Sequence, residues 1–506
     1  MEELSTKPKK GFLYLIERTG NALPHPAILF AYFALATLVL SAVGSLLGWN
    51  GLHPATQDRV DAVNLISRDG LHRIILEMVN NYTSFAPLGV VMVSLLGIGV
   101  AETSGLIKAC INSMLAKAPP KSVTFMVIFT GVVSSVASDM GYVLIIPMAG
   151  VIFHSLGRNP LVGLTAAFAG VSGGFSANII ISTIDPMMAG ISTEAANIID
   201  PEYYVMPTAN YYFLAASTFL LCIVGTIVSV KWTESQFGKY TGNVEREEIV
   251  QPTDLERKGL RRAGYVFLGW FVLFAIGLIP ENGIFRGTDG SVLQTPLLRG
   301  IVALLFLLGA SAGAVYGYTV GKFKKPEDVI TGMNDSFKTL VSYLVLVFFA
   351  AQFVAWFRWS NLGFLLAVNG AEVLQNAKIG LIPLLIIVAV FTGFINLFIG
   401  SASAKWAILA PVFIPIFMVM GLSPELAQAV YHVGDSTTNI ISPLLPYFAL
   451  IIVFYQKYDK NAGIGTIVAS MLPYSISFFV CWLIFLICWI SIGIPLGPGV
   501  SIYYGI

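Results

Sequence analysis

The stretch Ala-Ser-Asp-Met-Gly-Tyr-Val-Leu-Ile-Ile-Pro, at Ala137–Pro147, has a counterpart in the second half of the chain. The counterpart is Ala-Ser-Ala-Lys-Trp-Ala-Ile-Leu-Ala-Pro, at Ala402–Pro411. In both copies small residues lead into an apolar run that a proline closes. At matched distances downstream come a glycine and another proline in each half: Gly157 and Pro160, then Gly421 and Pro424. Matched motifs in the same order indicate an internal repeat, which is the sequence pattern of many transporters.

The composition around these motifs places the protein in a membrane. Of the 506 residues, 56% are hydrophobic and 11% are charged, whereas a soluble domain carries about 25% charged residues. The apolar residues form continuous runs of helix length rather than the period-two alternation of a β-barrel. The net charge of +1 gives no support to a nucleic-acid surface. We therefore expect an all-α integral membrane protein, a polytopic helical bundle in the lipid bilayer.

Each repeat contains apolar arms that are too short to cross a membrane. A spanning helix needs about 20 residues, and neither 134–147 nor 400–411 reaches that length. These arms predict two re-entrant hairpins, at about 134–155 and 398–420. Glycine and proline then interrupt the next apolar runs, which predicts broken helices at about 161–192 and 424–454. The expected fold is a bundle with inverted repeats, two re-entrant hairpins and broken helices.

Basic loops predict how the chain is divided and oriented. Residues 1–26 form a basic tail, and residues 231–262 form the longest polar insertion, which is rich in lysine and arginine. The positive-inside rule places both segments in the cytoplasm. The insertion is then a linker between a first transmembrane half, 27–230, and a second, 263–506. We expect a multi-pass protein of the inner (plasma) membrane with a cytoplasmic N-terminus.

Polar residues at the hairpin tips and helix breaks predict two cation sites. Ser138 and Asp139 lie at the first tip and Asn178 at the first break, while Ser401 and Asn439 take the equivalent places in the second half. Hydroxyl, amide and backbone carbonyl oxygens suit a hard cation. The expected coupling ion is sodium or a proton, between which the sequence does not decide. No cofactor is expected.

Two acids, Asp185 and Asp435, occur in only one repeat each and are predicted to serve the substrate or a proton, because an intramembrane carboxylate is costly. The alternative is a structural ion pair with a buried cation, for which Lys405 and His432 are available. Trp406 is predicted to stack on an aromatic substrate, with interfacial anchoring as the alternative.

The chain carries no recognisable nucleophile, metal-protease or nucleotide-binding motif, so an enzyme or an ATP-driven pump is not expected. A secondary active transporter working by alternating access is the leading prediction. A dicarboxylate carrier of related hairpin architecture and a gradient-following channel remain as alternatives.

Several separated motifs resemble the p-aminobenzoyl-glutamate transporter (AbgT) family. The resemblance runs from about residue 10 to the Pro-Leu-Gly-Pro-Gly stretch at Pro495–Gly499. The motifs that carry it are Pro24–Pro26, Asn81–Gly89, Gly174–Asn178 leading to Asp185, Gly190–Ala195, Gln352–Ala355, Trp359–Asn361, Ser403–Ala407 and Gly434–Ser436.

The resemblance implies a homodimeric inner-membrane transporter with nine spanning helices and two re-entrant hairpins. It also implies uptake of p-aminobenzoyl-glutamate, a small aryl carboxylate, or drug efflux of sulfonamide antimetabolites. One position departs from the family: His432 stands where members commonly carry an arginine, which puts the substrate charge and the ion coupling in doubt. The family's functional residues carry over onto Asp185, Asn396, Ser403, Trp406, Pro424, Asp435 and Pro443.

Overall fold

The computed structural model describes residues 24–52, 58–116, 119, 122–137, 141–246, 252–287 and 295–505. Two predicted cation ligands, Ser138 and Asp139, therefore lie outside the described residues, as does most of the basic tail. Within the described part the chain is helical except for a small antiparallel sheet of β1 (Asn50–Leu52) and β2 (Arg59–Asp61), in which Gly51 pairs with Val60.

The helices of the first half include short 3₁₀ and π segments (η), which mark the places where the regular pattern changes. In chain order they are α2 (Pro26–Leu46), α3 (Arg68–Thr83), α4 (Ala86–Ser104), α5 (Leu106–Ala116), α6 (Val123–Val133), η1 (Ser134–Ala137), η2 (Gly141–Ile145), α7 (Ile146–Ser155), α8 (Pro160–Phe168), η3 (Ala169–Gly173), α9 (Ile184–Ala196), α10 (Tyr211–Val228), η4 (Ser229–Thr233) and α11 (Glu234–Phe237).

The second half is more regular and contains the longest helix, α15. Its elements are α12 (Asp254–Leu278), α13 (Pro296–Arg299), α14 (Ile301–Val320), α15 (Pro326–Trp359), α16 (Leu362–Asn376), α17 (Leu381–Asn396), α18 (Ala402–Val419), α19 (Pro424–Asn439), α20 (Phe448–Tyr458) and α21 (Ile464–Ser491).

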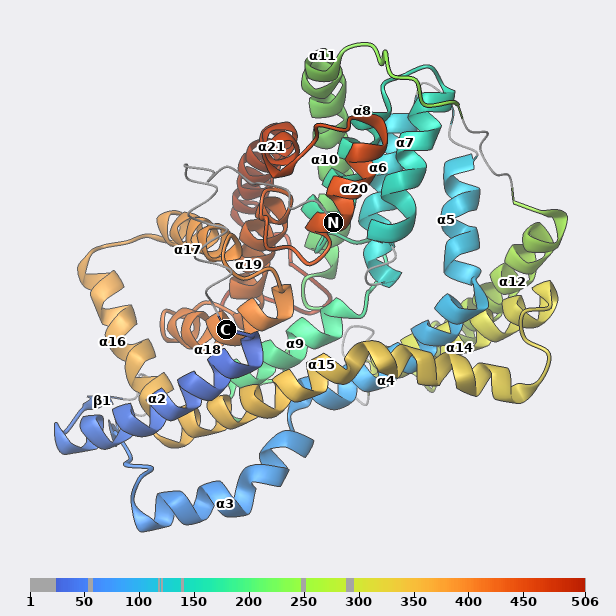
Figure 1. The fold of residues 1–506 in the computed structure, drawn as a ribbon. Helices are drawn as coiled ribbons and strands as arrows, with labels where there is room; N and C mark the ends of the chain where they lie inside the picture. Colours follow the sequence, from blue (N-terminus) through green and yellow to red (C-terminus); the bar gives the residue numbers. More distant parts are fainter. Residues whose placement is uncertain are drawn as a thin grey trace, which may run out of the picture.

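The helices form two groups that pack against each other (Figure 1). The scaffold group consists of long helices that run side by side: α2 with α15, α4 with α15, and α14 between α4 and α12. The core group contains α6–α8, α10, α17–α19 and α21, which hold most of the buried side chains. Helix α9 contacts α4 of the scaffold and α18 of the core, and it thereby connects the two groups.

The two sequence halves interleave in this arrangement. The scaffold takes α2 and α4 from the first half and α12, α14 and α15 from the second, and the core is equally mixed. Helical structure also reaches into the predicted linker from both sides, through Phe237 and from Asp254. Thr253 explains why α12 begins at Asp254. Its hydroxyl accepts the N–H of Glu256, and the Glu256 carboxylate accepts the N–H of Thr253.

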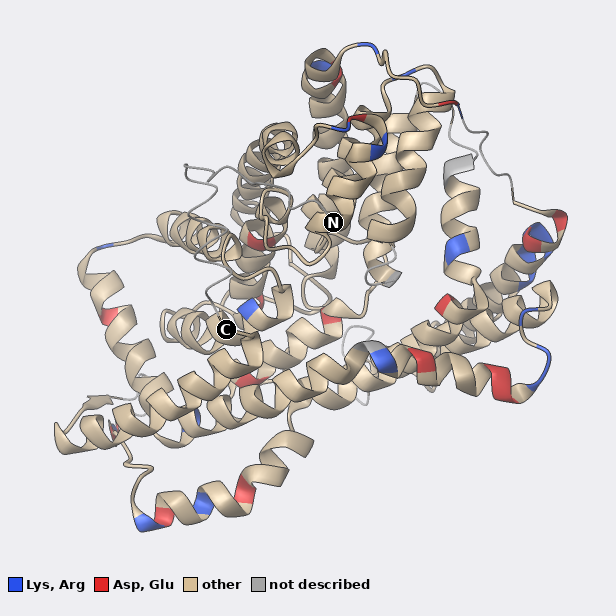
Figure 2. Cartoon of the chain, viewed as in Figure 1, with Lys and Arg blue, Asp and Glu red and all other residues tan. Residues whose placement is uncertain are grey.

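Length, composition and charge placement identify a multi-pass membrane protein. Among the described residues, eight helices are long and apolar enough to cross a bilayer. Lysine, arginine and acidic residues gather near helix ends and connections, as on α3, α12 and the α14–α15 turn, whereas the long helix bodies are nearly free of charge (Figure 2). Exposed apolar side chains cover the outer faces of α2 and α12, as lipid contact requires.

The prolines of the repeat fix where two core helices begin. Asn159 and Ser423 each accept a backbone N–H two or three residues ahead, and each is followed by a proline at the first helical position. A proline there loses no hydrogen bond, since its missing N–H lies in the unpaired first turn. Pro160 and Pro424 therefore start α8 and α19 in matching fashion.

Pro411, which closes the second copy of the repeated stretch, does not end its helix. This differs from the prediction made from the sequence. Helix α18 continues through Pro411 and Pro415 to Val419. A proline inside a helix removes one hydrogen bond and is tolerated in membrane helices because neighbouring groups take up the freed carbonyl. The arm is therefore 18 residues long rather than the short segment that ends at Pro411.

Candidate functional site

The two interrupted helices meet at the centre of the core. Helix α8 continues as η3 to Gly173 and then opens, while α19 ends at Asn439 before the Pro443 turn. The Ser436 hydroxyl donates to Ser176 Oγ at 2.8 Å and accepts the Ser176 N–H at 3.2 Å. The chain that follows η3 thus contacts the last turn of α19 directly. Backbone groups at these helix ends have no hydrogen-bond partner within their own helices.

A buried ion pair joins α18 to α19 beside this junction. Lys405 Nζ lies 2.5 Å from Asp435 Oδ1, and both side chains are fully buried. Lys405 Nζ also donates to Asn396 Oδ1 at the end of α17. The Asn396 amide nitrogen in turn lies within hydrogen-bond distance of Asp435 O, Thr438 Oγ1 and Asn439 Oδ1, at 2.6–2.9 Å. The ion-pair alternative that the sequence left open for Asp435 is the arrangement observed.

The pair leaves unsatisfied polar atoms on one face of α19. Tyr431 donates to Asp435 Oδ1 at 3.1 Å, while Asp435 Oδ2 and His432 Nδ1 are buried without a hydrogen-bond partner. The other ring nitrogen of His432, Nε2, lies 3.3 Å from Gln428 Nε2. Unpaired buried polar atoms are costly, and two of them lie here at residues predicted to be functional.

Trp406 lies against α19 and is fully buried. Its ring centre is 4.5 Å from that of Tyr431, and its indole N–H donates to Ser192 Oγ of α9 at 3.0 Å. Ser192 also donates to Gln428 Oε1 at 2.7 Å. Trp406 therefore connects α18, α19 and α9, and the contact predicted between its ring and a substrate stays a prediction.

Asp185 lies apart from the Lys405–Asp435 pair, at the start of α9. Its Oδ2 accepts the backbone N–H and the hydroxyl of Ser182, at 2.6 and 2.8 Å. Asp185 and Asn178 line a small cavity with Gln428 of α19. The Asn178 amide donates to Ser135 Oγ of η1 at 3.0 Å, and its role as a cation ligand stays a prediction.

A cavity of about 510 Å³ separates the core from the scaffold. Its core wall contains Tyr142 of η2 and residues 400–403 at the start of α18, together with Phe175 after η3 and Tyr447 ahead of α20. The scaffold wall comes from α2, α4 and α15. The rings of Tyr142 and Tyr447 stack with 4.5 Å between centres and 12° between planes. The volume falls within the usual range of small-molecule sites, about 300–1,000 Å³.

Three helix N-termini meet at this central cavity. Thr183 and Ile184 of α9, residues 401–403 of α18, and Tyr447 ahead of α20 all line it. The first N–H groups of a helix have no internal partner, and the helix dipole makes that end positive. Among the described residues that line the cavity there is no lysine, arginine, aspartate or glutamate. The cavity thus combines aromatic and methionine walls with three ends that favour an anion.

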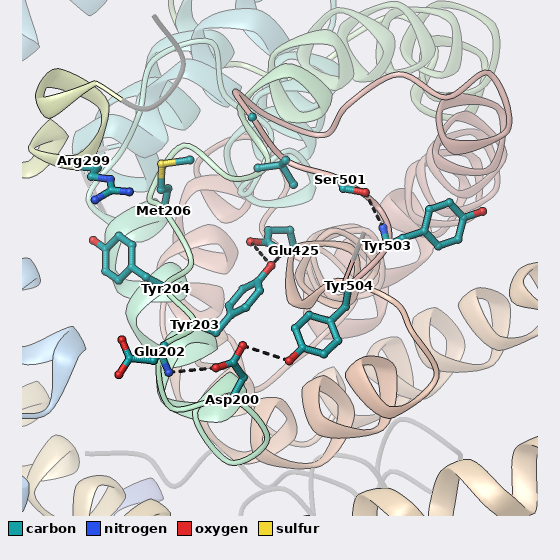
Figure 3. Close-up of a pocket in the computed structure, with 13 residues that line it drawn as sticks. Asp200, Glu202, Tyr203, Tyr204, Met206, Arg299, Glu425, Ser501, Tyr503 and Tyr504 are labelled. Carbon is teal, nitrogen blue, oxygen red and sulfur yellow. Dashed lines mark hydrogen bonds between the residues drawn. The ribbon is translucent and has the colours of Figure 1, made fainter. Parts of the chain in front are cut away.

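A second hollow, of about 740 Å³, lies where the chain between α9 and α10 meets the start of α19 and the C-terminal segment (Figure 3). Tyrosines and carboxylates line it, with Glu425 almost completely buried. Burial, with Glu425 nearby, holds the pKa of the Tyr203 phenol far above its ordinary value, so this hydroxyl stays protonated.

Comparison with known proteins identifies the family of this chain. The AbgT transporter family model matches residues 11–504. The chain belongs to this family. It is 37% identical over 502 residues to the p-aminobenzoyl-glutamate transport protein of Escherichia coli (strain K12), covering 99% of each chain. The protein is thus a membrane transporter and not an enzyme.

Two solved AbgT-family structures are similar to this fold. The YdaH transporter of Alcanivorax borkumensis shares 44% identity with a TM-score of 0.90, covering 94% of this chain and 100% of that one. MtrF of Neisseria gonorrhoeae, from a class of antimetabolite efflux pumps, shares 46% identity with a TM-score of 0.92, covering 97% of this chain and 100% of that one. The fold class is confirmed at the level of a polytopic, mostly helical membrane protein.

Apart from Trp406, sequence reasoning missed the aromatic residues of the site. Tyr142, Phe175 and Tyr447 line the central cavity, and Tyr431 bonds to Asp435. Tyr431 was detectable, because it lies one helical turn before Asp435 on the same face of α19. Tyr142 and Tyr447 meet only through the fold, since they are far apart in the chain.

Proposed function

We propose that the protein is a secondary active transporter of small aryl carboxylates such as p-aminobenzoyl-glutamate, or of sulfonamide antimetabolites. A proton or sodium gradient drives it. The central cavity is the substrate site, and the convergence of three helix N-termini on an aromatic-walled hollow is the observation that carries the proposal. A carboxylate lies against the first turn of α18, at Ser401 and Ser403, and the aryl ring lies beside Tyr142 and Tyr447.

The transport cycle follows from the division into scaffold and core. The core group moves against a homodimeric scaffold, which exposes the cavity between them first to one side of the membrane and then to the other. The segments at about 134–155 and 398–420 act as re-entrant hairpins of inverted repeats, in the plasma membrane with the N-terminus in the cytoplasm. Support comes from the paired proline starts of α8 and α19 and from the basic linker.

The acids and amides of the core couple ion movement to this motion. Asp185 and Asp435 exchange protons or contact sodium, and Asn178, Asn396 and Asn439 supply amide oxygens. His432 takes the place of the usual arginine, so one permanent positive charge is absent beside Asp435. Pro424 and Pro443 set the ends of α19, along which these groups lie.

The test is uptake by purified protein in proteoliposomes. Radiolabelled p-aminobenzoyl-glutamate is offered under an imposed proton gradient, a sodium gradient or neither, with succinate as competitor. We expect saturable uptake that one gradient accelerates at least tenfold, that sulfonamides inhibit and that succinate leaves unchanged. Asp185→Asn should abolish the acceleration.

Three outcomes contradict the proposal. Inhibition by succinate but not by aryl compounds indicates a dicarboxylate carrier. Unsaturable flux that only follows the substrate gradient indicates a channel. Full gradient-driven transport by both Asp185→Asn and Asp435→Asn shows that the acid assignments are wrong.

A further inference from the structure

The hollow at the start of α19 is a second cavity with its own chemistry. Its walls come from residues 200–206, from Glu425, from residues 499–505 at the end of the chain and from Arg299 (Figure 3). None of these residues lines the central cavity. Its volume of about 740 Å³ is large enough for a small organic molecule.

Two tyrosines in this cavity are fixed by carboxylates. The Tyr203 hydroxyl donates to both oxygens of Glu425, at 3.2 and 2.9 Å, and the Tyr504 hydroxyl donates to Asp200 Oδ2 at 3.1 Å. The two ring centres are 5.7 Å apart with 65° between planes. The rings therefore form a corner whose orientation is set at both hydroxyl ends, before any ligand enters.

Acidic side chains outnumber basic ones around the corner. Three carboxylates line the cavity, those of Asp200, Glu202 and Glu425, against the single guanidinium of Arg299. Arg299 lies beside Tyr204 and away from the Tyr203–Tyr504 corner (Figure 3). Glu425 is 5% exposed, and none of the ion pairs among the described residues involves it. A buried carboxylate of this kind favours a cation as neighbour.

We propose that this cavity binds a small organic cation, an amine or quaternary ammonium compound, between the Tyr203–Tyr504 corner and the carboxylates. Ring faces attract such cations electrostatically, and fixed rings bind them without a further ordering cost. An aryl carboxylate is repelled by the same groups. The site is therefore separate from the substrate cavity and selects the opposite charge.

The site also joins the two repeats, since Tyr203 follows α9 of the first half and Glu425 begins α19 of the second. A bound cation contacts both segments at once.

The experiment uses the full-length protein in lipid nanodiscs and a pair of probes of matched shape. Choline carries a quaternary ammonium, and 3,3-dimethylbutan-1-ol replaces that nitrogen with carbon. Isothermal titration calorimetry should show saturable choline binding, and binding of the alcohol at least tenfold weaker. Tyr203→Leu and Glu425→Gln should each weaken choline binding at least tenfold, while Tyr265→Leu, an exposed tyrosine on α12, should leave it unchanged.

Glu202→Gln keeps the test valid if Glu425→Gln fails to fold, because Glu202 is exposed at the cavity wall. This variant should weaken choline binding severalfold. Equal binding of choline and the alcohol overturns the proposal, as does choline binding that survives Tyr203→Leu. Excess p-aminobenzoyl-glutamate should not displace choline, and displacement overturns the separation of the two sites. Because the readout is binding, failure of the transport proposal leaves this result unaffected.

Discussion

At Lys405 and Asp435, two opposite charges are held where water does not reach, so removal of one leaves the other uncompensated. We expect Asp435→Asn to lower the free energy of unfolding by about 3–5 kcal/mol, because an unpaired buried ammonium is strongly unfavourable. Lys405→Met in that background should restore at least half of the loss. Thermal unfolding of purified protein in detergent measures both changes. Equal stability of the single and double variants would show that the pair is not the stabilising interaction.

The sequence predicted single residues well where their chemistry is unusual. An acid within an apolar segment draws attention because of its cost, and Asp435 and Lys405 were both identified in that way. The same reasoning could not decide between a substrate contact and an ion pair, since α18 and α19 are placed side by side only by the fold. Trp406 is similar: its exposure depends on how closely α9 packs, which the local sequence does not encode.

At the scale of the helix, close packing of α19 against α17 depends on Gly434. A methyl group at this position would lie 2.4 Å from Ala389 O of α17, so backbone would have to move. We expect Gly434→Ala to destabilise the protein by about 1–3 kcal/mol, as overpacking of a core does. Transport should fall as well, because the adjacent Asp435 shifts with the helix. Thermal unfolding and proteoliposome uptake give the two readouts.

The matched control is Gly264→Ala in α12, where an added methyl group has no heavy atom within 4 Å. That variant should fold and transport like the parent protein. A loss of stability at Gly264 as large as that at Gly434 would show that steric contact is not the cause.

The starts of the helices were more predictable than their ends. Pro160 and Pro424 mark helix starts in the sequence and in the structure, because a proline fits the first turn without losing a hydrogen bond. The sequence pattern predicts that Pro411 closes an arm, whereas Pro411 lies inside α18. A membrane helix tolerates such a proline when neighbours satisfy the freed carbonyl, and those neighbours are not visible in the local sequence.

For the whole molecule, the central cavity between scaffold and core is the substrate path that we propose. Ser342 of α15 lines it from the scaffold side. We expect Ser342→Trp to fill the cavity and to reduce transport at least tenfold, with little change in unfolding temperature because the space is open. Leu35→Trp, at a position on α2 that is 57% exposed, is the control and should transport normally. Normal transport by Ser342→Trp would place the substrate route elsewhere.

The membrane class was readable from the sequence, whereas the division into two helix groups was not. The repeat suggests two units that follow one another along the chain. The structure instead takes α2 and α4 into one group with α12, α14 and α15. Apolar runs show that a helix enters the membrane, but its neighbours are chosen by side-chain packing between distant segments.

The Ser176–Ser436 contact also has a consequence for biogenesis. Its two residues are separated by 260 positions in the chain. At a synthesis rate of about 5–20 residues per second, roughly 13–50 seconds pass between the synthesis of Ser176 and that of Ser436. During that time the freed groups around Ser176 are within the bilayer without their final partners. The Ser176–Ser436 contact can therefore form only late in synthesis, after most of the second half has been made.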